Sequence, residues 1–266
     1  GMIRSGIGPQ QNAHGEAFVW ALSALSILTG HSRSKGGGLS IFNLPDVNLG
    51  LSARDDLKQE KTRSLDMTRL GEILNGEVGP NGMGDGPSVK GLLIWGTNPA
   101  VVLPESAKIR RGLAREDLFT VVLEHFMTDT AKHADIILPS TTQLEHFDVV
   151  LPWGHYYMAA NNPAIAPLGE SKSHGEIMRL VAHRMGLNHP AMQESDEEIA
   201  AAGLPPELPL EMLKSDGWRK HAPAPAGIPA ADKRISLAGY PAPDDLPSPE
   251  TMGTNSLHLL TPKAHY

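Results

Sequence analysis

The chain has 266 residues, 40% of them hydrophobic, and a formal net charge of −7 at pH 7. This composition is typical of a soluble protein with a sizeable core. No polybasic pattern indicates a nucleic-acid partner, and the mild acidity argues against a membrane-surface role. Apolar runs are far shorter than the roughly 18 residues of a membrane-spanning helix, so we expect no membrane span. The absence of cysteine excludes disulfides, thiolate zinc sites and cysteine-bound iron–sulfur clusters within this sequence.

The first third of the chain predicts short, separate elements. Residues 14–29 carry apolar side chains at helical spacing, which predicts a helix. A short strand is expected over 39–42, after a glycine cluster, and Asp66 is placed to cap a helix over 67–74. The glycine-rich run 79–86 follows a helix and precedes a strand. A dinucleotide-binding fingerprint has the reverse order, so we interpret this run as a loop.

Strands then alternate with helices. Strands are expected over 91–95, 118–123 and 135–138, with helices over 104–114 and directly after Thr130. The strands are almost wholly apolar, which is typical of strands buried on both faces. Their alternation with helices predicts right-handed βαβ units and a parallel sheet with helices on both faces.

The last third of the chain is rich in proline. Ser173 is placed to cap an amphipathic helix, which ends before residue 189. Two short helical patterns, near 194–202 and 208–215, interrupt a proline-rich stretch that we interpret as a linker or wrapping segment. The sequence predicts a further strand over residues 256–261.

The carboxyl ends of the predicted strands are the place to look for a ligand site. In an open parallel sheet ligands bind beyond these ends, which selects the loops 96–99, 124–130 and 139–142. Gly96 would let the backbone approach a phosphate closely. Glu124 offers an acceptor-only carboxylate, suited to the donor edge of guanine or to ribose hydroxyls.

Thr128 and Thr130 allow two interpretations. Their hydroxyls can face a ligand, with Glu124 beside them. Alternatively, both threonines cap the helix that follows and Glu124 is simply solvated. The residues alone leave both interpretations open.

Other patterns do not indicate chemistry. The pairs Glu124-His125 and Glu145-His146 lack the i, i+4 spacing of a zinc-binding helix. No Ser-His-Asp order or nucleophile elbow is visible. We therefore predict no catalytic and no metal-ligating residue, and a hydrolase or transferase is disfavoured.

Three stretches resemble a known family. They are GLLIWGTNP (91–99), VVLEHFMTDTAKHADIILPSTTQLEH (121–146) and NPAIAPLGESKSHGEIMRLVAHRMGL (162–187). The pattern F-x-T-x-T-A followed by A-D-I-I-L-P resembles the molybdopterin oxidoreductases of the dimethyl sulfoxide reductase and formate dehydrogenase superfamily. GIGPQQNAHG (6–15) and LHLLTPKAHY (257–266) are similar to flanking parts of the same family.

The resemblance implies an α/β fold: a Rossmann-like parallel sheet with helices on both faces, followed by a Pro-rich extended tail. It implies binding of molybdopterin guanine dinucleotide, which holds molybdenum or tungsten, with Glu124 at the guanine. Aspartate is commoner at this position. The remaining implied contacts lie in the same loops. The predicted cofactor-binding residues are Gly96, Thr97, Asn98, Pro99, Glu124, Phe126, Thr128 and Thr130.

The resemblance also implies what this chain lacks. Relatives carry an iron–sulfur region and a metal-ligating Cys, selenocysteine or Ser, which we expect in parts of the parent enzyme outside this sequence. The arginine that formate dehydrogenases place after the glycine cluster is not found, since LSIFNLPDVN stands at 39–48. We therefore expect the chain to be inactive alone, with the remaining domains or subunits of a formate dehydrogenase-like oxidoreductase as partners. A non-catalytic nucleotide-binding or interaction module is the alternative.

The resemblance implies four divisions of the chain. Residues 1–35 are expected to be a helix and turn from the preceding part of the parent enzyme, and 36–188 the Rossmann-like cofactor-binding domain. Residues 189–253 are expected to be the Pro-rich linker. Residues 254–266 are expected to be the first strand of a truncated C-terminal domain.

Overall fold

The computed structural model describes residues 1–10, 15–41, 47–48, 51, 53–57, 64–77 and 87–222. The chain divides into two compact units. The first comprises Gly1–Asp46, Leu151–Tyr157 and Lys220–Tyr266, and the second comprises Val47–Val150 and Met158–Arg219. The sequence-predicted loop 79–86 and strand 256–261 lie outside the described residues.

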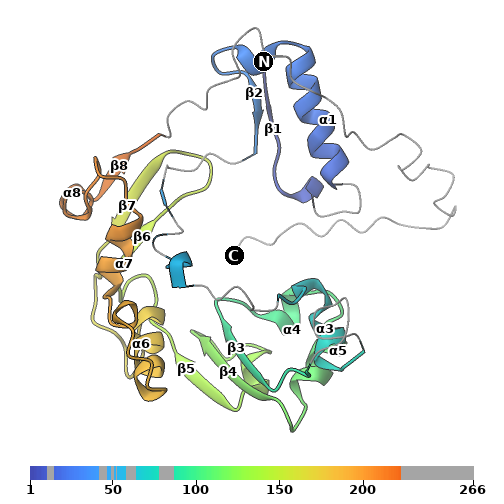
Figure 1. Ribbon diagram of the computed structural model, residues 1–266, viewed down its shortest axis with the longest axis vertical. Helices are drawn as coiled ribbons and strands as arrows, with labels where there is room; N and C mark the ends of the chain where they lie inside the picture. Colours follow the sequence, from blue (N-terminus) through green and yellow to red (C-terminus); the bar gives the residue numbers. More distant parts are fainter. Residues whose placement is uncertain are drawn as a thin grey trace, which may run out of the picture. The chain divides into compact units, whose positions relative to one another are not determined.

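The first unit is built on a parallel strand pair and one long helix (Figure 1). Strand β1 (Met2–Arg4) pairs with β2 (Gly38–Ser40), with Ile3 opposite Leu39. Helix α1 (Gly15–Leu28) packs against both strands, with short 3-10 turns η1 (Gly8–Gln10) and η2 (His31–Arg33) beside it. The predicted helix over 14–29 is therefore confirmed over its described residues.

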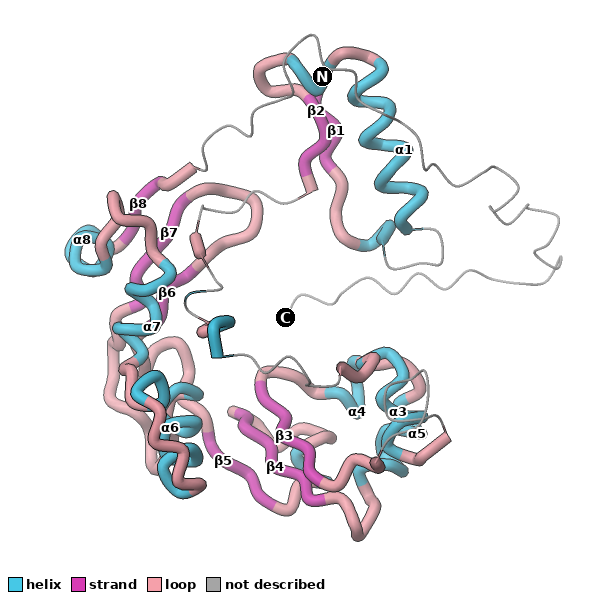
Figure 2. Tube along the Cα trace, in the orientation of Figure 1, coloured by secondary structure: helices cyan, strands magenta, loops and turns pink. Residues whose placement is uncertain are grey.

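A three-stranded parallel sheet organises the second unit. Its strands are β3 (Gly91–Trp95), β4 (Phe119–Glu124) and β5 (Ile136–Pro139), in the order β3-β4-β5. Trp95 lies opposite Leu123, and Glu124 lies opposite Pro139, so the three carboxyl ends meet at one edge. Figure 2 shows how helical segments separate these strands along the chain. The predicted α/β class with a parallel sheet is confirmed.

Short helices precede the first strand of this sheet and lie between its strands along the chain. They are η3 (Asp55–Leu57), η4 (Met67–Arg69), α3 (Leu70–Leu74), α4 (Pro99–Val102), α5 (Ser106–Leu113) and η5 (Ala131–His133). The Asp66 carboxylate accepts the Thr68 N–H at 2.9 Å, which confirms the predicted cap. Sequence patterns missed α4. It is separate from α5 because Leu103, the residue before Pro104, is extended, as residues before proline usually are.

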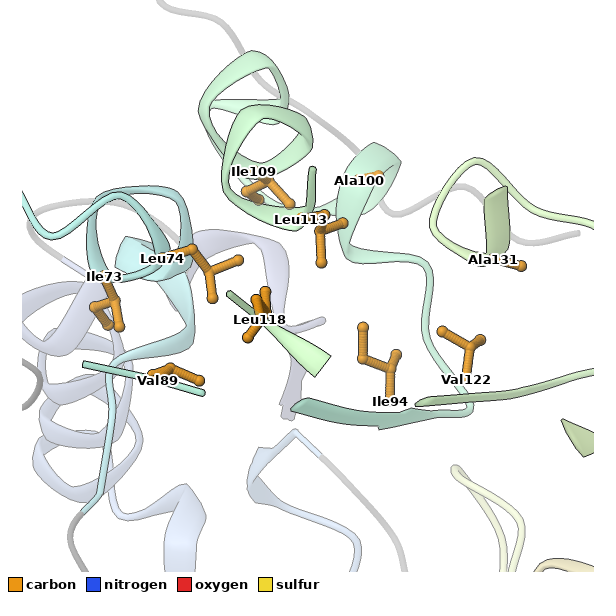
Figure 3. Close-up of a cluster of buried hydrophobic side chains, with 10 residues drawn as sticks. All are labelled: Ile73, Leu74, Val89, Ile94, Ala100, Ile109, Leu113, Leu118, Val122 and Ala131. Carbon is orange, nitrogen blue, oxygen red and sulfur yellow. The ribbon is translucent and has the colours of Figure 1, made fainter. Parts of the chain in front are cut away.

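The main core lies between this sheet and helices α3, α4 and α5 (Figure 3). It contains Ile73, Leu74, Val89, Ile94, Ala100, Ile109, Leu113, Leu118, Val122 and Ala131. Ile94 and Val122 lie opposite each other in neighbouring strands, so both point from the same face of the sheet toward the helices.

The opposite face of the sheet departs from the prediction. Leu93 and Trp95 of β3 and Phe119 at the start of β4 are 41%, 53% and 52% exposed, although the sequence predicted strands buried on both faces. Within β4 the prediction is confirmed, because the neighbouring residues Val122 and Leu123 point to opposite faces and are 0% and 1% exposed. Among the described residues, the helices α3, α4 and α5 cover one face only. Apolar composition did not distinguish a strand buried on one face from a strand buried on both.

The rest of the second unit follows β5 along the chain. Its elements are β6 (Asp148–Val150), β7 (Tyr157–Asn161), α6 (His174–Arg184), η6 (Pro190–Met192), α7 (Asp196–Gly203), α8 (Leu210–Asp216) and β8 (Trp218–Lys220). The strands form a second sheet in the order β6-β7-β8, with β6 and β7 antiparallel. The Ser173 hydroxyl accepts the Glu176 N–H at 3.1 Å, which confirms the predicted cap of α6.

The proline-rich stretch contains the two helices that its pattern predicted, α7 and α8. Leu208, Leu210 and Leu213 are buried there, so this part contributes to the core of the second unit. Residues 223–253 lie outside the described part of the chain. No helix in the described ranges has the length and apolarity needed to cross a membrane.

A glycine in α5 tests how closely the helices pack. A Cβ atom at Gly112 would lie 2.4 Å from the Leu74 Cβ of α3. Gly112→Ala should lower the free energy of unfolding by on the order of 1 kcal/mol, because overpacking outweighs the gain in helix propensity. Gly91→Ala is the control, since a Cβ there meets nothing within 4 Å. Urea denaturation of both variants measures the difference, and a fully stable Gly112→Ala variant would contradict this packing.

Candidate nucleotide-binding site

Three loops meet at the carboxyl edge of the β3-β4-β5 sheet. They are residues 96–99 after β3, 124–130 at the end of β4, and 140–142 after β5. The register brings the strand ends together, and the Ser140 N–H donates to the Glu124 carbonyl at 3.2 Å. We call this edge the rim. All eight residues that the sequence predicted as cofactor-binding lie in its first two loops.

A buried hydrogen-bond cluster ties these two loops together. The Thr130 hydroxyl donates to Asn98 Oδ1 at 2.6 Å and accepts the Ala100 N–H at 3.0 Å. The Thr130 N–H donates to the same Asn98 oxygen at 3.2 Å. Thr130 is 0% exposed. Its hydroxyl therefore holds the rim together from within and is enclosed by protein.

Thr128 and Thr130 differ in what they do. The Thr128 hydroxyl accepts the Ala131 N–H at 3.1 Å and so caps η5, whereas Thr130 makes no side-chain cap bond. Thr128 is half-buried, and its hydroxyl hydrogen remains able to donate. The capping role that the sequence allowed for both threonines is thus found for Thr128.

The outer surface of the rim is open at three predicted positions. Gly96 has φ 64°, in the left-handed region that favours glycine, and a Cβ there would meet nothing within 4 Å. Thr97 is exposed, and Phe126 is 77% exposed. Pro99 is buried at the start of α4. Gly96, Thr97 and Phe126 can therefore contact a ligand without rearrangement of the loops, whereas Pro99 cannot.

Glu124 ends β4 in a half-buried position. Its Oε1 accepts the N–H of the next residue, His125, at 2.8 Å. Among the residues that the structure describes, no lysine, arginine or histidine forms an ion pair with Glu124. A half-buried carboxylate without a counter-ion retains the capacity to accept further hydrogen bonds.

Sequence reasoning missed the buried turn that closes the rim after β5. The Glu145 carboxylate accepts the Thr142 N–H at 2.7 Å, the Thr142 hydroxyl at 2.8 Å and the Leu168 N–H at 2.7 Å. These hydrogen bonds lower the pKa of Glu145. The signal was present, since Thr142 and Glu145 have the spacing of a capping box.

Three histidines gather around the same turn. His125 Nε2 donates to the Thr141 carbonyl at 2.9 Å, and His146 Nδ1 lies 2.9 Å from the Thr141 hydroxyl. His174 Nε2 lies 3.1 Å from the hydroxyl of Ser140. Within the described ranges, no three His, Asp or Glu side chains are grouped so that they could hold a metal ion.

The buried link between the rim loops can be tested against an exposed threonine. Thr130→Val should lower the free energy of unfolding by about 1–3 kcal/mol, because it leaves the buried Ala100 N–H without an acceptor and removes one of the two hydrogen bonds that the Asn98 oxygen accepts. Thr97→Val makes the same chemical change at an exposed position and should leave stability nearly unchanged. Urea denaturation gives both values, and equal stability of the two variants would refute the link.

Comparison of the sequence with known proteins identifies its family. The sequence profile of the family described as Molybdopterin oxidoreductase matches residues 1–184. "Probable oxidoreductase YoaE" of Bacillus subtilis (strain 168) is 35% identical over 96% of this chain and 39% of its own length.

Two further relatives are more distant. "Dimethyl sulfoxide reductase DmsA" of Escherichia coli (strain K12) is 29% identical over 70% of this chain and 24% of its own length. "Putative formate dehydrogenase SH0748" of Staphylococcus haemolyticus (strain JCSC1435) is 27% identical over 75% of this chain and 22% of its own length. The chain therefore spans about two fifths or less of these curated relatives.

The family match over residues 1–184 includes the rim, and it confirms the resemblance drawn from residues 91–187. The chain belongs to the molybdopterin oxidoreductase family.

Proposed function

We propose that this chain forms one wall of the cofactor site in a molybdopterin-dependent oxidoreductase and binds the guanine dinucleotide arm of the cofactor at the rim. The observation that carries the proposal is Glu124: a half-buried carboxylate without an ion-pair partner in the described structure, at the carboxyl edge of a parallel sheet. Ligands of open α/β sheets bind at this edge.

The chemistry of Glu124 favours guanine over adenine. The Watson–Crick edge of guanine presents two adjacent N–H donors, which a carboxylate can accept with both oxygens. The same edge of adenine presents an acceptor beside its amino group, and a carboxylate cannot donate to it. Each hydrogen bond to the Glu124 carboxylate is charge-assisted. Because Glu124 is half-buried, these hydrogen bonds are also partly shielded from water.

The other rim residues divide into two groups. Gly96 and Thr97 expose backbone and a hydroxyl where a phosphate can approach, and Phe126 offers an exposed ring for stacking. Asn98 and Thr130 hold the two loops together, and Pro99 is buried at the start of α4. We propose that these three residues support the cofactor site without direct contact to the nucleotide. Thr128 combines both roles, since it caps η5 and retains a donor.

Molybdopterin, when bound, would hold molybdenum or tungsten and supply the redox chemistry. The residues of this chain would bind and orient its nucleotide end. We assign no catalytic or metal-ligating residue here, and propose that other domains or subunits of a formate dehydrogenase-like oxidoreductase complete the active site.

The proposal predicts base-selective binding by the chain. Titration calorimetry with GDP should detect binding that Glu124→Gln weakens by roughly tenfold or more, the equivalent of one or two charge-assisted hydrogen bonds. Glutamine replaces one acceptor by a donor, which opposes a guanine N–H. ADP should bind more weakly than GDP to the parent chain and be little affected by the substitution.

Glu116→Gln is the matched control, because Glu116 is exposed and carries the same charge. This variant should bind GDP like the parent chain. Equal GDP affinity of Glu124→Gln and the parent would overturn the role of Glu124. If the unsubstituted chain binds no GDP at roughly millimolar concentration, which corresponds to a binding free energy near 4 kcal/mol, the result would favour a non-catalytic interaction module instead.

A further inference from the structure

The first residue of helix α6 contacts the rim through its side chain. His174 Nε2 forms a hydrogen bond with the hydroxyl of Ser140, which is 6% exposed. The N–H of Ser140 in turn donates to the carbonyl of Glu124. The imidazole thus connects the amino end of α6 to the turn that borders the end of β4.

A positive charge on His174 would be unfavourable for three reasons. The ring is partly withdrawn from water, and this burial is the main cause that lowers the pKa of His174. Positive charge on His125 or His146 lowers it further. In addition, His174 begins an eleven-residue helix, whose amino end carries the positive end of the helix dipole.

The charged groups around His174 come from several elements. From the loops after β4 and β5 and from α6 and α7 they are Glu124, His125, Glu145, His146, Glu176, Arg179 and Asp196. Glu124 favours protonation of His174 but is outweighed by burial and the other histidines. Glu145, Glu176 and Asp196 are already bound to Thr142, Lys172 and Arg179, respectively.

We propose that His174 is a proton-sensitive latch, which holds the Ser140–Thr142 turn against α6 when neutral and releases it when protonated. The opening is local, because the Lys172 N–H continues to donate to the Pro139 carbonyl and so holds the end of β5. Release of the turn breaks the hydrogen bond from the Thr141 N–H to the Lys172 carbonyl, which is 3.1 Å long in the closed state. The latch does not rest on nucleotide binding at the rim and goes beyond it.

The direction of the pH effect follows from the sign of the shift. A histidine with a lowered pKa in the closed state binds its proton less readily there than in the open state. The closed state is therefore fully stable above the ordinary histidine pKa of about 6.5 and loses stability as the pH falls below it.

Hydrogen exchange of the full chain tests the latch. Amide protection of residues 140–142, corrected for intrinsic exchange, should be several-fold lower at about pH 5.5 than at about pH 7.5. His174→Gln keeps a side chain that can hydrogen-bond to Ser140 but cannot titrate, so its protection should be the same at both pH values. His183→Gln, at an exposed position in the last turn of α6, should keep the pH dependence of the parent.

Two results would overturn the proposal. One is a His174→Gln variant, folded by circular dichroism, whose 140–142 amides lose as much protection at acid pH as those of the parent. The other applies even if that variant does not fold. NMR titration of the unsubstituted chain should show that His174 protonates below the ordinary histidine pKa of about 6.5, and protonation at or above that value would exclude the latch.

Discussion

The rim depends on one buried contact, the hydrogen bond from the Thr130 hydroxyl to the Asn98 side chain. This contact joins the loop after β3 to the loop after β4, and the Ala100 N–H adds a third partner to it. An unmade bond here would leave polar atoms unpaired in the interior, which is costly. The loops that carry Gly96 and Glu124 are therefore fixed relative to each other before any ligand arrives.

Sequence patterns predicted the elements well where composition and spacing agree. The strand, loop and helix order from 91 to 139 follows directly from apolar runs broken by Gly96 and by the polar residues after Glu124. The caps at Asp66 and Ser173 were predictable because a short polar side chain precedes each helical pattern. The position of the loops at one edge then follows from the parallel register alone.

Other features could not be read from the sequence because they depend on contacts between distant segments. Nothing local shows that Thr130 is enclosed while Thr128 is only half-buried, since both follow the same strand. His174 and Ser140 are 34 residues apart, and their contact depends on how α6 packs. The exposed face of the sheet is a similar case, because an apolar strand does not reveal which of its faces is covered.

That exposed face has a consequence for the colloidal behaviour of the chain. Leu93, Trp95 and Phe119 form an apolar surface on a sheet whose first strand, β3, has no further strand beside it among the described residues. Such surfaces promote self-association unless charge keeps the molecules apart. The net charge of −7 provides this repulsion near neutral pH. Repulsion weakens as carboxylates take up protons or as salt screens them, so solubility should depend on both acidity and ionic strength.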